Sequence, residues 1–312
     1  MKLATRLNSF LRTEKSILAV FNNLKNIDDL NYVDLNYPEH FNDVSVKEVK
    51  DSLQKNNLKV NGLAMRFKKP FINGKLSRKD KTAAQAIDLC KKAINITKEL
   101  NGTQLTIWLG YDGFDYSFQV NYEEVWKQLV YSFRKIADYD KNIIISIEYK
   151  PYEPRSYSII PDVGTTLLMV NDVDRDNVGV TLDYCHMLMK GENPAYGLSL
   201  TSLKNKLYGV HLNDGYGMQD DGLIVGSVSF IKTLEFLYYM KKNNYDGVIY
   251  FDTFPLREKA IEESKINIKM LKKYLNIIDR IGMDYIQAII NKNDAIEAQK
   301  IFLKAVESDR GV

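Results

Sequence analysis

Short apolar segments alternate with longer amphipathic segments along most of the chain. Each apolar segment is about as long as a strand and is rich in β-branched and aromatic residues, which is typical of buried strands. The segments predicted as strands are 6–11, 32–38, 59–67, 103–110, 142–150, 178–185, 207–214 and 246–255. Helical periodicity predicts helices over 13–25, 45–56, 79–99, 121–140, 163–173, 193–204, 229–243 and 258–275.

Strands that alternate with helices in this way indicate a parallel sheet. The pattern fills residues 1–275, which suits a closed (β/α)8 TIM barrel of typically ~250 residues. A doubly wound open sheet is the alternative, but its first strand is followed by a glycine-rich turn, and residues 6–15 contain no glycine. We therefore predict an α/β fold, with a (β/α)8 TIM barrel over 1–275 and a C-terminal helical arm over 276–312. The arm is either an oligomer contact or simple packing on the outside of the barrel.

Composition excludes several classes of protein. The 312 residues include 43 basic and 40 acidic ones, a net charge of +3 without a long basic run, which argues against a nucleic-acid partner. No apolar run is long enough for a membrane span, and the N-terminus lacks the apolar core of a signal peptide. Cys90 and Cys185 fit neither a CxxC motif nor a zinc spacing, which suits a reducing compartment. We expect a cytoplasmic homodimer or homotetramer.

Polar residues gather at the ends of the predicted strands, where TIM barrels carry their active sites. The run "NIIISIEYK" ends in Glu148 and Lys150, which share a face with Ser146 because strand side chains alternate. Other strands end in Asp183, His211 and Asp252. The chain has only three histidines, and each lies at or just after a predicted strand end: His40, His186 and His211.

A carboxylate at the rim of an apolar strand is costly unless it is paired or bound to a metal. Four successive strands end in three carboxylates and one imidazole: Glu148, Asp183, His211 and Asp252. Such a donor set suits Mn²⁺, Mg²⁺, Co²⁺ or Zn²⁺. The alternative is a network of buried ion pairs, in which Lys150 and the histidines neutralise the acids. We favour a divalent metal, with Mn²⁺ as the first choice, and expect no organic cofactor.

Five motifs carry a family resemblance: "EYKPYEP" (148–154), "DVGTT" (162–166), "LDYCH" (182–186), "HLNDG" (211–215) and "DDGLIVGS" (220–227). In this order they resemble the sugar isomerases of the xylose-isomerase-like superfamily, in particular the bacterial L-rhamnose isomerase type. The resemblance covers residues 140–255 and is only architectural before residue 100.

The resemblance implies a metal site and a catalytic site. Glu148, Asp183, His211 and Asp252 would bind a structural metal, and His186 with Asp220 or Asp221 would hold a second, catalytic metal or its water. Lys150 would lie beside the substrate oxygens. The chain departs from the family where Gln219 precedes the two aspartates in place of a longer acidic run. The sequence therefore leaves open which of Asp220 and Asp221 is the ligand.

The substrate site is less well defined. The segment "IWLGYDGFDYSFQ" (107–119) is similar to substrate-binding segments of the superfamily, so Trp108 and Phe118 could stack on a sugar and Asp112, Asp115 and Gln119 could bind hydroxyl groups. The alternative is that they are rim-core and turn residues. His40 and Asn213 are further candidates for substrate binding. Basic residues follow two strands and could hold an anionic group of a sugar: Arg66, Lys68, Lys69 and Arg155.

The resemblance implies a metal-dependent aldose–ketose isomerase acting on a small-molecule sugar. The basic residues after the strands add the hypothesis that the sugar is an anionic hexose. The C1–C2 hydrogen would move as a hydride or, through an enediol, as a proton taken by a base. Lys150, Glu148, Asp252 and His186 are the expected catalytic residues. One alternative is a ketose 3-epimerase, in which Glu148 and Asp252 flank the sugar. Another is a metal-dependent lyase or deglycosidase subunit that needs a partner chain.

Overall fold

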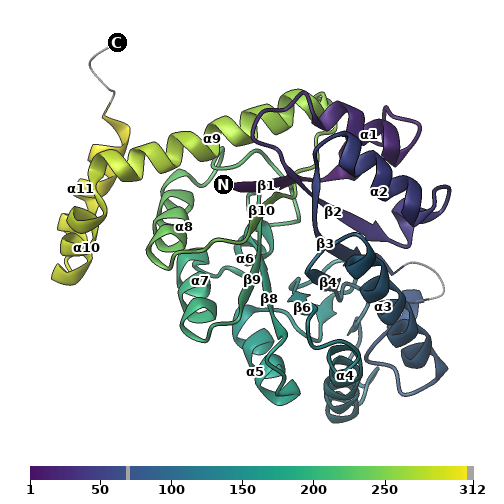
Figure 1. Cartoon of the computed structure of the whole chain (residues 1–312). Helices are drawn as coiled ribbons and strands as arrows, with labels where there is room; N and C mark the ends of the chain where they lie inside the picture. The colour runs from purple at the N-terminus through teal and green to yellow at the C-terminus, as the bar shows by residue number, and fades with distance from the viewer. Residues whose placement is uncertain (68–70, 308–312) are drawn as a thin grey trace.

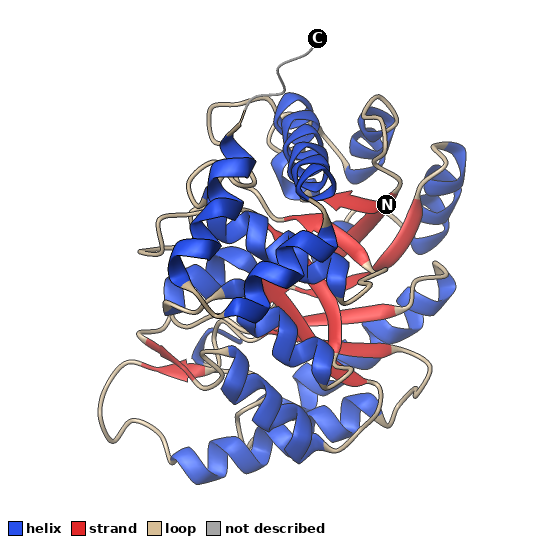
Figure 2. Ribbon diagram, turned by 90° about the vertical axis from the view of Figure 1, so that its left-hand side faces the viewer, coloured by secondary structure: helices blue, strands red, loops and turns tan. Residues whose placement is uncertain are grey.

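The structure is a computed structural model that describes residues 1–67 and 71–307. Eight parallel strands form one sheet, and its two edge strands meet to close a (β/α)8 TIM barrel, as predicted. The strands in sheet order are β1 (Lys2–Thr5), β10 (Val248–Phe251), β9 (Leu207–Leu212), β8 (Val178–Asp183), β6 (Ile144–Glu148), β4 (Gln104–Trp108), β3 (Lys59–Met65) and β2 (Tyr32–Tyr37). Figure 2 shows these strands inside a shell of helices.

The barrel closes between β1 and β2 through a few contacts. The Leu3 carbonyl accepts a hydrogen bond from the Asn31 N–H at 3.3 Å. The Leu3 N–H donates to Asn31 Oδ1, also at 3.3 Å. A parallel bridge joins Leu3 to Leu30. These contacts hold the two edge strands of the sheet side by side, and Figure 1 shows β1 between β2 and β10.

The prediction of the first strand, over 6–11, is wrong. The strand β1 lies earlier, and its Thr5 pairs with Phe251 of β10. Residues Leu7–Ser9 form instead a short 3-10 helix, η1. Leu7 and Phe10 are both buried, and a spacing of three places them on one side of a helical turn rather than on opposite faces of a strand. The other strands of the barrel lie within their predicted segments.

The helices lie where periodicity predicted them, with one addition. They are α1 (Ile17–Leu24), α2 (Val46–Lys55), α3 (Lys81–Glu99), α4 (Tyr122–Ala137), α5 (Val163–Val173), α6 (Tyr184–Lys190), α7 (Pro194–Leu203), α8 (Phe230–Lys242) and α9 (Ala260–Ile281), with the 3-10 helices η2 (Glu39–Phe41) and η3 (Phe71–Asn73). The sequence analysis missed α6, which begins directly after β8 without a loop. Side-chain caps define several starts, such as the Ser45–Glu48 capping box of α2.

The C-terminal arm begins inside a helix. Helix α9 continues past residue 275 to Ile281, and α10 (Met283–Lys292) and α11 (Ala295–Val306) follow it. The two short helices lie at the outer end of α9 (Figure 1), where Arg280 donates to the Glu307 carbonyl at 2.9 Å. Whether the arm forms an oligomer contact stays a prediction. No helix in the described part of the chain is long and apolar enough to cross a membrane.

Side-chain alternation makes the inside of the barrel polar. Ile145 and Ile147 are buried under the helices, while the Ser146 hydroxyl lies 2.5 Å from the Thr181 hydroxyl in the interior. The same alternation ends each strand with one inward-facing residue at the carboxyl mouth. Around the mouth these residues are Arg6, Asn36, Arg66, Trp108, Glu148, Asp183, His211 and Asp252. A small antiparallel sheet of β5 (Gly113–Phe114) and β7 (Tyr157–Ser158) lies in the loops.

Candidate metal centre

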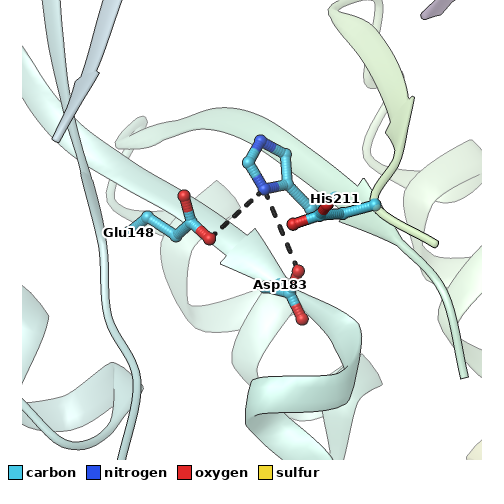
Figure 3. Close-up of side chains that lie close together, drawn as sticks. Glu148, Asp183 and His211 are labelled. Carbon is cyan, nitrogen blue, oxygen red and sulfur yellow. Dashed lines mark ion pairs between the residues drawn. The ribbon is translucent and has the colours of Figure 1, made fainter. Parts of the chain in front are cut away.

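Four side chains meet at the mouth as the sequence predicted. Glu148, Asp183, His211 and Asp252 each offer a ligand atom, and these atoms all lie within 4.8 Å of one another. Figure 3 shows Nδ1 of His211 pointing at the carboxylates of Glu148 and Asp183, at 3.5 Å and 3.9 Å. Consecutive strands of one sheet bring the four residues together, so their positions follow from the strand order.

Local structure fixes the orientation of Asp183. As the N-cap of α6 it accepts the His186 N–H on Oδ1 at 3.0 Å, which places His186 on the same side of the mouth. The Asn213 side chain donates to both Asp183 oxygens, at 3.3 Å and 3.2 Å. Asn213 in turn accepts the Cys185 N–H at 2.8 Å. Asn213 thus holds a candidate metal ligand, and its contact with a substrate stays a prediction.

Several buried polar atoms at the mouth have no hydrogen-bond partner among the described residues. They include His211 Nδ1, Asp252 Oδ1 and Asp220 Oδ1. A buried polar atom without a partner costs about 1–3 kcal/mol. Oxygen donors with one imidazole nitrogen are ligands that Mn²⁺, Mg²⁺, Co²⁺ and Zn²⁺ accept. The residues present therefore fit a divalent metal.

A second cluster adjoins the first and shares Asp183 with it. It consists of Asp183, His186 and Asp220. His186 Nε2 lies 3.2 Å from Asp220 Oδ2, and its Nδ1 lies 2.8 Å from the Tyr149 carbonyl oxygen. Asp221 is used elsewhere, since it accepts the Tyr216 N–H at 2.7 Å. Of the two aspartates considered from the sequence, only Asp220 belongs to this cluster of described residues. Binding of a metal by Asp220 stays a prediction.

Lys150 lies between the second cluster and the loop that follows β6. Its ammonium donates to Asp220 Oδ2 at 2.9 Å and pairs with Glu153 Oε2 at 3.0 Å. The side chain is 9% exposed, so both carboxylates hold it in one place. Lys150 therefore lies beside the second cluster, and its contact with substrate oxygens stays a prediction.

In the first cluster, which we call the first centre, the pKa of each side chain depends on the charges of its neighbours. The first centre consists of Glu148, Asp183, His211 and Asp252. Burial raises the pKa of Glu148, but the nearby His211 outweighs it and lowers that pKa to about 2. Burial raises the pKa of Asp183 to about 7, with Asp220 and Asp252 adding to the effect. Burial lowers the pKa of His211, but Glu148 and the other acids outweigh it and raise it to about 9. The protonated His211 imidazole thus offsets part of the negative charge of the carboxylates, as a bound cation would.

The family follows from the sequence. Residues 26–274 match the family described as "Xylose isomerase-like TIM barrel". The chain belongs to this family. It is 24% identical over 246 residues to a xylose isomerase from Thermus thermophilus, covering 76% of this chain and 64% of the relative. It is 26% identical over 249 residues to a probable sugar isomerase from Mesorhizobium japonicum, covering 76% of this chain and 56% of the relative.

The chain thus spans less than two thirds of the length of these curated relatives. Among solved structures, a D-tagatose 3-epimerase-like protein superposes with a TM-score of 0.72 at 19% identity, covering 90% of this chain and 99% of that chain. At this identity the likeness concerns the fold. It agrees with the xylose isomerase-like barrel that the strands form.

Other predicted site residues occupy the opposite half of this barrel mouth. His40 lies after β2, where Nδ1 accepts the Asn36 N–H at 3.0 Å and Nε2 lies 2.8 Å from Asn8 Oδ1. Trp108 is the last residue of β4, and the Arg66 guanidinium lies 6.0 Å from its ring. Their contacts with a substrate stay predictions.

Loop contacts engage the remaining candidates. Asp112 is 1% exposed and accepts the N–H groups of Lys75 and Ser77 at 2.9 Å and 3.0 Å. Arg155 donates to Asp115 at 2.9 Å, which joins the loops after β4 and β6. Phe118 is fully exposed. Lys68 and Lys69 lie outside the described residues.

Two residues of the mouth were missed. Arg6 follows β1 directly, and its Nε lies 3.4 Å from Asp252 Oδ1; the misplaced first strand concealed it. Lys75 is fully buried, donates to the Trp108 carbonyl at 2.8 Å and lies 4.6 Å from the centre of the Phe67 ring. Burial lowers the pKa of Lys75 to about 8. A lysine in a long polar loop gives no sequence signal of such burial.

Proposed function

We propose that this protein is a metal-dependent aldose–ketose isomerase that interconverts sugars at C1 and C2. The observation that carries the proposal is the convergence of Glu148, Asp183, His211 and Asp252 at the mouth of the barrel. Two curated relatives named as isomerases, a xylose isomerase and a probable sugar isomerase, support it. Mn²⁺ is the ion that we propose first, because three of the four donors are carboxylates, which suit Mn²⁺.

The reaction moves one hydrogen between neighbouring carbons and one proton between their oxygens. Glu148, Asp183, His211 and Asp252 would hold a divalent ion, which would supply Lewis acidity toward the carbonyl of the sugar. Asn213 keeps the Asp183 carboxylate oriented, as its two hydrogen bonds show. Lys150 presents an ammonium beside Asp220 and is placed to donate a proton to a substrate oxygen. In a hydride route no base is needed at carbon, whereas in an enediol route Glu148 or Asp252 would take the proton.

The test measures metal content and turnover together. The protein is stripped with EDTA, Mn²⁺ is added back, and neutral and acidic aldoses and ketoses are followed by carbon NMR. We expect C1–C2 conversion that depends on Mn²⁺. Glu148→Gln and His211→Ala should lose bound Mn²⁺, while Asp138→Asn should keep it, because Asp138 pairs with Arg175 on the protein surface. Full Mn²⁺ occupancy in both site variants would overturn the metal assignment.

A ketose 3-epimerase is the second candidate. The fold likeness to a D-tagatose 3-epimerase-like protein favours it, as does the meeting of two carboxylates, Glu148 and Asp252, from different strands. The same NMR experiment separates the two reactions, because an epimerase inverts C3 of a ketose and leaves C1 and C2 unchanged. Bound metal with no turnover of any sugar would instead favour a lyase subunit that needs a partner chain.

A further inference from the structure

The two halves of the barrel mouth differ in chemistry. The half formed by β6, β8, β9 and β10 carries the candidate metal ligands. The half formed by β1, β2, β3 and β4 carries Arg6, Asn36, Arg66 and Trp108 at the corresponding positions. The mouth therefore has two guanidinium groups that the metal-binding residues do not explain.

Both guanidinium groups have N–H donors that make no hydrogen bond to the described residues. Arg6 Nε is buried without a hydrogen bond to any described residue, and its ion pair with Asp252 is 3.4 Å long. Within residues 1–67 and 71–307, the Arg66 side chain has no hydrogen bond or ion pair. Its guanidinium lies 6.0 Å from the centre of the Trp108 ring, and the charges of Asp252 and Glu148 act on it. A guanidinium has five N–H donors in a planar fork that suits oxyanions.

The two arginines face one region of the mouth. Strands β1 and β3 lie on either side of β2 around the closed barrel, so the two arginines enter the mouth from the same side. Arg6 Nε reaches across to Asp252, whose Oδ1 lies 3.4 Å away. Arg6 is also held in place by the Phe254 ring, with its guanidinium carbon 4.6 Å from the ring centre.

Neutralisation of the acids is the competing explanation for the arginines. The first centre has three carboxylates, those of Glu148, Asp183 and Asp252. A divalent ion offsets two of these charges, and Glu39, whose charge also acts on Arg66, adds one. Two negative charges then face two arginines, so neutralisation accounts for the charge of the arginines. It does not fill their N–H donors, because Arg6 Nε has no hydrogen bond to a described residue and each guanidinium has five donors. The metal-loaded mouth therefore keeps donors for an additional oxyanion.

We propose that Arg6 and Arg66 form an oxyanion-binding pair, so that the substrate is a sugar carrying a phosphate, carboxylate or sulfonate group. This inference rests on the proposed function, since it places the reacting carbons at the metal-binding half of the mouth. The anionic group lies opposite, on the half formed by β1 to β4. Charge-assisted hydrogen bonds to a guanidinium are strong enough to set substrate preference.

Binding of unreactive analogues tests the pair without requiring turnover. Calorimetry with the Mn²⁺-loaded protein compares D-glucitol 6-phosphate, D-gluconate and a sulfonated hexitol with neutral D-glucitol. We expect at least one acidic analogue to bind about tenfold more tightly than D-glucitol or better, since a charge-assisted hydrogen bond is worth about 1.5–3 kcal/mol. The best analogue identifies which acidic group the site takes.

Variants assign the preference to the two side chains. Arg6→Gln and Arg66→Gln should each remove about tenfold of it, whereas Arg66→Lys should keep part of it. Arg175→Gln is the matched control, because Arg175 pairs with Asp138 on the surface, and it should keep the full preference. Circular dichroism and Mn²⁺ content verify that each variant is folded and loaded.

The outcomes separate this inference from the proposed function. Equal binding of acidic and neutral analogues, with arginine variants that change only Mn²⁺ affinity, would overturn the oxyanion pair and leave the isomerase untouched. An acidic preference that both arginine variants lose supports the pair, even when no sugar is converted at C1 and C2. In that case the proposed reaction fails and the anion site stands.

Discussion

Asn213→Ala should destabilise the protein strongly, because Asn213 holds together several groups at the mouth of the barrel. The side chain is fully buried and its amide links three groups. It accepts the Cys185 N–H at 2.8 Å, donates to both oxygens of Asp183 and lies 3.1 Å from the Asp252 carbonyl, to which it also donates. Its removal leaves the Cys185 N–H and the Asp252 carbonyl without these partners and weakens the hold on Asp183.

The magnitude follows from the cost of buried polar groups without partners. Each such group costs about 1–3 kcal/mol. Asp183 keeps the His186 N–H as a partner, so the two remaining groups should cost about 2–6 kcal/mol in total. The free energy of unfolding is measured by urea titration in EDTA, which removes any contribution of metal binding. Asn243→Ala is the control, because Asn243 makes one exposed hydrogen bond, to the Tyr239 carbonyl at 2.8 Å.

The control should lose no more than about 1 kcal/mol. A loss of similar size for Asn213→Ala would refute the reasoning, because it would mean that water replaces the amide at the mouth. Asn213→Asp sharpens the test. It keeps the shape of the side chain but sets a second carboxylate beside Asp183, so it should be as destabilised in EDTA and should recover part of its stability when Mn²⁺ is added.

Three further predictions concern the centre and its surroundings. The pKa of His211 is about 9 in the folded protein and about 6.5 when unfolded, so its stabilising effect is complete below pH 6.5 and is lost as the pH rises through 9; urea unfolding in EDTA should show this fall, and His211→Asn should flatten it. Lys150→Met should lower turnover at least ~10²-fold at unchanged Mn²⁺ content; unchanged turnover would exclude it from catalysis. Gly222 has a φ of +56°, and a Cβ there would lie 2.5 Å from the Phe254 ring. Gly222→Ala should therefore displace the loop that carries Asp220 and weaken Mn²⁺ binding at the second cluster. Gly191→Ala, at φ +75° with open space, is the control, and equal Mn²⁺ stoichiometry in the two variants would contradict the steric argument.

The sequence was sufficient to predict the barrel fold and the convergence of the four residues of the first centre. Strands of a parallel barrel are buried on both faces, so their apolar runs stand out against the helices. Because each strand must end at the same rim, a single carboxylate or imidazole after each run already implies convergence. Glu148, Asp183 and His211 could therefore be placed without any contact being known. The same reasoning failed at β1, because only four residues form that strand and the helical turn after it is more apolar.

Contacts between loops were beyond the reach of the sequence. Asn213 follows a strand, as substrate-binding residues do, but its amide turns inward to Asp183 and Cys185. Arg155 lies near a strand end, yet its guanidinium donates to Asp115. The position of a residue in the sequence indicates at which end of the barrel its side chain lies. Its hydrogen-bond partner depends on the path of a neighbouring loop, which the pattern of apolar and polar residues does not predict.

The polar atoms without partners explain why these residues occupy the mouth at all. Among the described residues, the buried atoms without hydrogen bonds include those of Arg6, His211, Asp220 and Asp252, all of which lie in the two candidate metal clusters or in contact with them. Well-packed apolar residues in place of buried charges often leave a protein equally or more stable, so folding alone gives no reason for this arrangement. A ligand that supplies the missing contacts removes their cost and stabilises the folded state in proportion to its affinity. Cations at one half of the mouth would give partners to the atoms of His211, Asp220 and Asp252, and an oxyanion at the other half would give one to Arg6 Nε. The proposed metal and the proposed acidic substrate therefore account for these buried atoms together.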